Sequence, residues 1–124
     1  MATNHFITLQ KGIDMTTLYR LQKENILATA FKNQNVLPLS ETFDRTAIDA
    51  ILQEEGCTSF RIYYGMSEDL LVHAILVGVN ESNEDILPSS ENSISTLIDS
   101  ADDVIAEQGI RCPPDCPASS PLNG

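Results

Sequence analysis

The clearest periodic pattern in the chain lies between residues 41 and 55, where apolar side chains recur every three or four positions. This spacing places them on one face of a helix. Ser40 is a favourable N-cap, and Gly56 can end a helix in the left-handed conformation. We therefore predict a helix over residues 41–55. Its apolar face consists of Phe43, Ala47, Ile48, Ile51 and Leu52.

Two further helices are predicted from weaker patterns. Residues 8–27 carry apolar side chains at i+4 steps after Thr8, a suitable N-cap, and the helix can continue or restart towards residue 31. Residues 96–108 follow Ser95, another suitable cap, and precede Gly109. The apolar stripe of this last helix comprises Leu97, Ile98, Ala101, Val104 and Ile105.

The predicted strands are recognised by a change in the spacing of apolar side chains, from every three or four positions to every second position. Residues 58–65 alternate apolar and polar side chains, which predicts a half-buried strand. Residues 70–79 are β-rich and apolar on both faces, which places this strand centrally in a sheet. The short polar loop between them favours an antiparallel hairpin. A brief third strand is predicted at residues 85–88, where Pro88 would end it.

These elements predict the fold class. We expect an α+β protein with a small antiparallel sheet, a hairpin or meander around residues 58–88, and three or so helices. A chain of 124 residues fits one domain, which we place at residues 1–109. Residues 110–124 contain four prolines and predict an extended proline-rich tail.

The charge of the chain disfavours two classes of binding partner. The net charge is −11, and residues 66–124 hold eleven acidic residues against one basic residue, Arg111. Such a surface repels phosphate backbones and anionic lipids, so neither nucleic-acid binding nor membrane binding is expected. The first residues lack the basic and apolar regions of a secretory signal. We therefore expect a cytoplasmic protein.

Three cysteines offer candidate metal or redox chemistry. An odd count without a secretory signal predicts reduced thiols. Cys112 and Cys116 have a spacing seen in half of a zinc site, and Cys57 with His5 or His73 would have to complete it. A redox pair and a haem-binding Cys-Pro motif are alternatives, but the pair lacks the C-x-x-C spacing of dithiol enzymes. The ordinary interpretation is a stiff tail that packs its thiols as small apolar groups, with no cofactor.

A catalytic hypothesis centres on His73 in the predicted central strand. His73 could act as a base, with Arg61 holding an anion and Tyr63 donating a proton from the neighbouring strand. The alternative is a hydrogen-bonded strand histidine with no catalytic role. No nucleophile motif and no glycine-rich phosphate loop accompanies these residues, so an enzyme is not the favoured prediction.

Four segments resemble small bacterial proteins of unassigned function, of a type associated with Bacteroidota. They are E-T-F-D-R-T-A-I-D-A-I-L, F-R-I-Y-Y-G-M, V-H-A-I-L-V-G-V-N and the ending R-C-P-P-x-C-P-x-S-S-P-L-N. The resemblance extends over most of the chain. It implies a bacterial cytoplasmic context, and it supplies no activity, cofactor or catalytic residue.

These observations favour a non-catalytic acidic protein that acts through contacts with a protein partner or by self-association. The proline-rich tail supports this prediction, because prolines lose little further entropy when they lie along a neighbour. The alternative is a module that binds a metal or small molecule through Cys112, Cys116, Cys57 and a histidine. The third hypothesis is a small enzyme built around His73.

Overall fold

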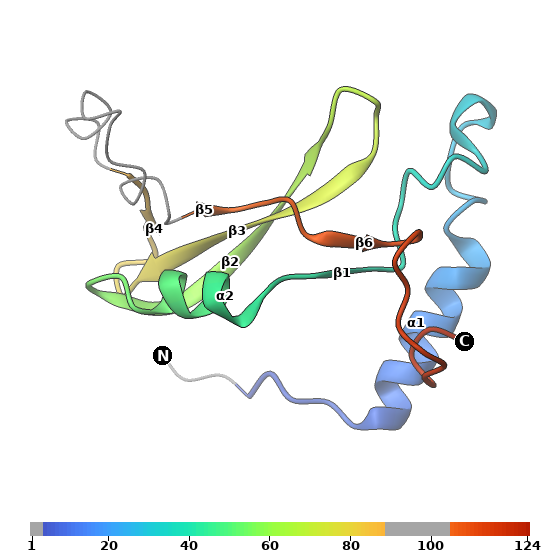
Figure 1. Cartoon of the computed structure of the whole chain (residues 1–124). Coiled ribbons are helices and arrows are strands. Elements are labelled where there is room, and N and C mark those ends of the chain that lie inside the picture. Colours follow the sequence, from blue (N-terminus) through green and yellow to red (C-terminus); the bar gives the residue numbers. More distant parts are fainter. Residues whose placement is uncertain (1–3, 89–104) are drawn as a thin grey trace. The chain divides into compact units, whose positions relative to one another are not determined.

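The chain folds into two compact units. The computed structural model describes residues 4–88 and 105–124 (Figure 1). Unit 1 combines Met1–Ser40 with Arg111–Gly124, and unit 2 is the intervening segment Glu41–Ile110. The sequence suggested a separate tail at residues 110–124, but residues 111–124 group with the N-terminal residues.

Unit 2 is organised around a long antiparallel hairpin. Strand β2 (Cys57–Met66) pairs with strand β3 (Val72–Asn80) (Figure 1). Tyr63 lies opposite Ile75 in this pairing. The aromatic and β-branched side chains of both segments favour extended backbone. The hairpin predicted from the alternating pattern is thus present.

The other edge of β3 is occupied in succession by two short strands. Strand β4 (Asp85–Ile86) pairs with Gly78 and Val79, and strand β5 (Ile105–Ala106) pairs with Leu76 and Val77. Both pairings are antiparallel. Strand β3 is therefore the central strand of a four-stranded sheet, and β2 lies at the edge of that sheet.

Helix α2 (Arg45–Leu52) packs against β2, β3 and β5. Asp44 stands at its N-cap with extended backbone. Ile51 is 1 % exposed and reaches β3 at Gly78, where a Cβ would lie 3.0 Å from the sulfur of Cys57 and 3.4 Å from the Ile51 carbonyl oxygen. Glycine therefore permits the close packing of helix on strand. Among the described residues of unit 2, the buried apolar ones are Ile51, Leu76, Val77 and Val79.

Unit 1 begins with helix α1 (Leu9–Gln22), which Thr8 caps as predicted by accepting the Lys11 amide hydrogen through its hydroxyl. A single turn of 3₁₀ helix, η1 (Thr29–Phe31), follows. The loop after η1 is held to the C-terminal segment, because Arg111 donates to the carbonyl oxygens at positions 35 and 36 at 2.9 and 3.1 Å. Val36 and Cys112 are the buried apolar residues here.

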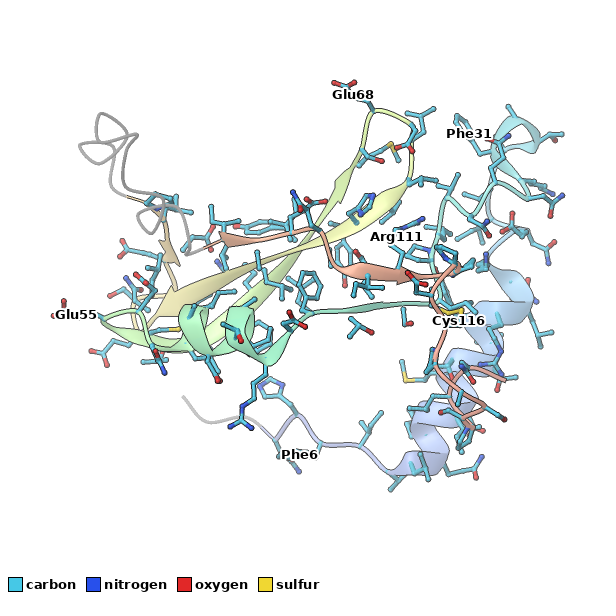
Figure 2. All side chains as sticks on the ribbon, viewed as in Figure 1. Phe6, Phe31, Glu55, Glu68, Arg111 and Cys116 are labelled. Atoms are coloured by element: carbon cyan, nitrogen blue, oxygen red, sulfur yellow. A yellow bond between two sulfur atoms is a disulfide. The ribbon has the colours of Figure 1, made fainter. Side chains whose placement is uncertain are left out.

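The C-terminal segment is a series of turns. Cys112 and Cys116 form a disulfide (Figure 2, where Cys116 is labelled). The Arg20 guanidinium donates to the Leu122 carbonyl oxygen at 2.8 Å. The Leu122 side chain lies beside Gly12 of α1, where an added Cβ would be 3.6 Å from Cδ2 of Leu122. The predicted extended arm is therefore wrong, since the tail folds back onto the helix of its own unit.

The two segments that link the units pair with each other. Strand β1 (Ser40–Thr42) and strand β6 (Ile110–Cys112) form a separate two-stranded antiparallel sheet. Each strand carries the chain from one unit into the other.

The expectation of three or so helices is wrong. The described residues contain two α-helices, and the fold is a sheet-rich α+β arrangement. The predicted helix 41–55 begins only at Arg45, because residues 40–42 form β1, and it ends at Leu52. Gly56 nevertheless adopts the predicted left-handed conformation, with a φ of 83°.

The predicted C-terminal helix is also corrected where the structure describes it. Ile105 and Ala106 form β5, because they complete hydrogen bonds along the edge of β3. Tertiary pairing thus overrides the helical pattern at these two positions. The remainder of that pattern, residues 96–104, lies outside the described residues.

Within residues 4–88 and 105–124, no helix has the length and apolar character needed to cross a bilayer.

Alkaline pH is expected to destabilise unit 1 through Tyr19. Its hydroxyl donates to the Pro38 carbonyl oxygen at 2.7 Å, and burial raises the pKa of Tyr19 above 10, opposed by nearby Arg111. Because the folded-state pKa is raised, this stabilisation is complete below the unfolded-state pKa near 10 and is lost as pH rises through the folded-state pKa. Urea unfolding, followed by the circular dichroism of α1 between pH 8 and 11, measures this loss.

The Tyr19→Phe variant is the informative comparison. It should be less stable than wild type at pH 8 by about 1 kcal/mol, and the difference should shrink at high pH. Tyr64→Phe, which removes a hydroxyl from an exposed tyrosine, serves as the control. A constant difference between Tyr19→Phe and wild type across this range would refute the assignment.

Candidate functional site

Among the described residues, strand β2 has a paired strand on one side only, so its other side is an open sheet edge. The Ala74 amide hydrogen is donated to Oε1 of Glu41 at 2.7 Å and not across the hairpin. Ala74 lies opposite Tyr64, so this pair directs its backbone groups away from each other. By the alternation of an antiparallel ladder, the backbone N–H and C=O groups of Phe60, Ile62, Tyr64 and Met66 therefore point outwards.

These four residues also carry exposed apolar side chains on one face of the strand. The exposed fractions are 44 % for Phe60, 47 % for Ile62, 79 % for Tyr64 and 58 % for Met66. Among residues 4–88 and 105–124, no hydrogen bond reaches their outward backbone groups. The strand thus combines an unpaired edge with an apolar face, which is a template for adding another strand.

Charge is almost absent from this strand. Arg61 is the one lysine, arginine, aspartate or glutamate in β2. Its guanidinium donates to Oδ1 of Asp85 and to Oδ1 of Asn83, while the Tyr63 hydroxyl donates to Oδ2 of Asp85. Hydrogen bonding to Tyr63 and to Asp85 raises the pKa of Arg61, so its guanidinium stays charged.

His73 lies in a second cluster, at the start of β3. Its Nδ1 is 3.6 Å from Oε2 of Glu41 and 3.6 Å from Oε2 of Glu107. Both separations exceed hydrogen-bonding distance. The Glu41 side chain is only 8 % exposed, and neither its Oε2 nor His73 Nδ1 has a hydrogen-bond partner among the described residues.

The catalytic trio proposed from the sequence is therefore divided between two clusters. Arg61 and Tyr63 converge on Asp85, whereas His73 faces Glu41 and Glu107. Ladder parity does place all three residues on one face of the hairpin, as the sequence suggested. No hydrogen bond joins His73 to either of the other two among the described residues.

An open groove lies beside Glu107. It has a volume of about 550 Å³ and runs between α2 and residues 105–108. Ala47 and Ala50 line its apolar side, and Asp44 and Glu107 contribute carboxylates. Its size falls within the range of small-molecule sites, about 300–1,000 Å³.

The cysteines do not form the expected ligand set. The prediction of reduced thiols is wrong for Cys112 and Cys116, which are joined in a disulfide, while Cys57 is free and half-buried. His5 is exposed in unit 1. Among the described residues, no three His, Cys, Asp or Glu side chains form a group that could hold a metal ion.

Local backbone geometry explains the disulfide. The Asp115 amide hydrogen is donated to the Arg111 carbonyl oxygen at 3.0 Å, which closes the chain into a turn. The two cysteine Cα atoms are consequently 4.6 Å apart, within the range that a disulfide requires. Sequence spacing alone could not reveal this turn.

Replacing both cysteines with alanine is expected to destabilise unit 1 by about 2 kcal/mol, because a five-residue ring restricts the unfolded chain. Hydrogen exchange of the Leu39 amide, which donates to the Cys112 carbonyl oxygen, reports this loss locally. The Cys57→Ala variant controls for thiol removal elsewhere. Unchanged Leu39 protection in the double variant would contradict the prediction.

The candidate residues that sequence analysis missed are mainly acidic. Glu41 was assigned to a helix, Glu107 to the end of another helix, and Asp85 to a short strand without a role. The exposure of the β2 face that carries Phe60, Ile62 and Tyr64 was also missed. An alternating pattern predicts that the apolar face of a strand is buried, but it does not show which element covers that face.

The chain was compared with protein-family models, curated proteins and solved structures. None of these three comparisons found a match.

Proposed function

We propose that this chain acts through protein–protein contacts made along the outer edge and exposed face of β2. The observation that carries the proposal is the coincidence of outward backbone groups and exposed apolar side chains at Phe60, Ile62, Tyr64 and Met66. An added strand would satisfy the backbone groups, and alternate side chains would supply specificity.

The composition of the chain supports a protein partner over other macromolecules. A net charge of −11 disfavours phosphate backbones and anionic lipid surfaces. Strand β2 itself is neutralised, since Asp85 accepts from Arg61. An extended peptide can therefore approach this strand without meeting the repulsion that acidic regions of the chain impose.

Site-specific photo-crosslinking tests this function. A benzophenone amino acid placed at Tyr64, in the cells that naturally produce the protein, should yield a discrete covalent adduct. The same probe at Thr46, an exposed position on α2, should not yield that adduct. The captured protein is then identified and purified, and it should bind wild type more tightly than Ile62→Pro.

Two results would refute the proposal. The first is the absence of any adduct from Tyr64. The second is a captured protein that binds wild type and Ile62→Pro equally, since the proline removes one outward N–H donor of β2.

A cytoplasmic location is part of the original prediction, and the disulfide weighs against it because cytoplasmic thiols are kept reduced. Alkylation of thiols in intact cells, followed by measurement of the protein mass, distinguishes a cytoplasmic location from an oxidising compartment. Modification of all three cysteines supports the cytoplasm, and modification of Cys57 alone supports an oxidising compartment.

A small-molecule function is the second candidate, and one observation favours it. Glu107 lines the groove, and its Oε2 lies 3.6 Å from Nδ1 of His73, an atom without a hydrogen-bond partner among the described residues. Screening small cationic fragments by amide chemical shifts tests this candidate. Saturable shifts at Ala47 and Glu107 would support it, and unchanged shifts throughout the groove would remove it.

A further inference from the structure

We propose that the strand added to β2 is β2 of a second copy, paired antiparallel across a two-fold axis beside Tyr63. This inference rests on the proposed function, because it assigns the partner of the same edge. Two four-stranded sheets would thereby join into one continuous sheet in a dimer.

Backbone geometry identifies the occupant as an extended strand. The outward N–H and C=O groups alternate along residues 60–66, over about 20 Å of regular register. A helix has no free backbone groups along its length with which to satisfy them. Only another strand matches this spacing of donors and acceptors.

The register follows from the positions of the outward groups. An axis beside Tyr63 places Phe60 opposite Met66 and Ile62 opposite Tyr64, each pair occurring twice. All four outward residues then lie in hydrogen-bonded pairs, which gives about eight intermolecular hydrogen bonds. The cross-strand neighbours are all apolar, and such pairs stabilise a sheet.

Electrostatics favour this register over its neighbours. Arg61 is opposed by Gly65 of the partner strand, so no like charges face each other. A register centred on Arg61 would instead place two guanidinium groups opposite each other. The whole chain carries an excess of eleven negative charges, which disfavours self-association through its acidic surfaces.

The two-fold symmetry of this pairing limits the assembly to two copies. An antiparallel pairing of identical strands uses the same surface on both copies, and this isologous contact consumes the edge completely. Strand β4 and strand β5 already occupy the other edge of β3. The pairing therefore ends at two copies and protects an edge that would otherwise invite aggregation.

Light scattering of the purified chain tests the stoichiometry. Wild type should have twice the chain mass of 13.6 kDa. Ile62→Pro removes an outward donor from each copy and should weaken dimerisation at least about tenfold. Ile62→Lys keeps the backbone donor but introduces repelling charges, so it should also weaken the dimer if the proline variant fails to fold. Thr46→Lys, on α2, controls for added charge.

Cysteine crosslinking tests the register. In a Cys57→Ala background, Tyr63→Cys should form a covalent dimer upon oxidation, because facing residues at a non-hydrogen-bonded pair have Cα atoms about 4.5 Å apart. Tyr64→Cys is the matched control, since its two copies would be offset beyond the roughly 7 Å reach of a disulfide.

Distinct outcomes separate this inference from the proposed function. A monomer at every concentration, or a dimer that both Ile62 variants leave unchanged, overturns self-pairing. Preferential crosslinking through Tyr64→Cys overturns the register. If the chain is monomeric but the Tyr64 probe captures a different protein in cells, the proposed function stands and the second copy is rejected.

Discussion

The Ile51→Ala variant is expected to destabilise unit 2 by about 2–5 kcal/mol, the usual cost of truncating a buried isoleucine. Ile51 is 1 % exposed and lies where α2 meets β3. Its loss would leave a cavity beside Gly78, a residue without a side chain to fill it. Native-state hydrogen exchange at Leu76 and Val77 measures the change within unit 2.

A neighbouring residue supplies the control for this prediction. Leu52 follows Ile51 in the same helix but is 45 % exposed. Leu52→Ala should therefore change the free energy of unfolding much less than Ile51→Ala does. Equal losses from the two substitutions would show that α2 does not pack on the sheet through Ile51.

Glu41→Ala is expected to destabilise unit 2 by about 1–3 kcal/mol, because it leaves a part-buried backbone N–H without its acceptor. Glu41 is 8 % exposed at its side chain and accepts the Ala74 amide hydrogen at 2.7 Å. The substitution also removes the carboxylate that faces His73. Urea unfolding and the exchange rate of the Ala74 amide measure the two consequences.

Two variants separate the loss of the hydrogen bond to Ala74 from the loss of the carboxylate that faces His73. Glu41→Gln retains an oxygen that can accept the Ala74 amide hydrogen, so it should preserve more stability than Glu41→Ala. Glu107→Ala removes the more exposed carboxylate, at 40 % exposure, and should cost less. Equal losses for Glu41→Ala and Glu107→Ala would show that the backbone hydrogen bond contributes nothing.

The hairpin could be predicted from sequence because its signal is local. Residues 58–65 alternate, residues 70–79 are apolar on both faces, and a short polar loop joins them. The observed register then places Tyr63 and Arg61 on the face that carries His73. Adjacent strands with these patterns have few other ways to pair.

The elements that pair at long range could not be predicted in this way. Residues 40–42 pair with residues 110–112, and Ile105 pairs with Val77. Ser40 suits a helix cap, and Ile105 suits a helical stripe, when each is judged by its neighbours in sequence. Their strand conformations depend on partners distant in the chain.

The residues on the candidate face could be read from the sequence, but the position of their strand at the edge of the sheet could not. The alternation of Phe60, Ile62 and Tyr64 defines a face, yet only the strand order shows that this face belongs to an edge strand. Likewise, the spacing of Cys112 and Cys116 fits several chemistries, and the turn that brings their Cα atoms together decides among them.

Hydrogen exchange along β2 is the most direct test of the claim that its outer edge is the interaction surface. In dilute monomer, the inward amides of Arg61 and Tyr63 should exchange slowly, and the outward amides of Phe60, Ile62 and Tyr64 should exchange rapidly. Raising the protein concentration should slow the outward amides selectively. Two results would contradict the account. In the first, the outward amides are already protected at high dilution. In the second, they stay unprotected at millimolar concentration and also in the presence of the protein captured by crosslinking.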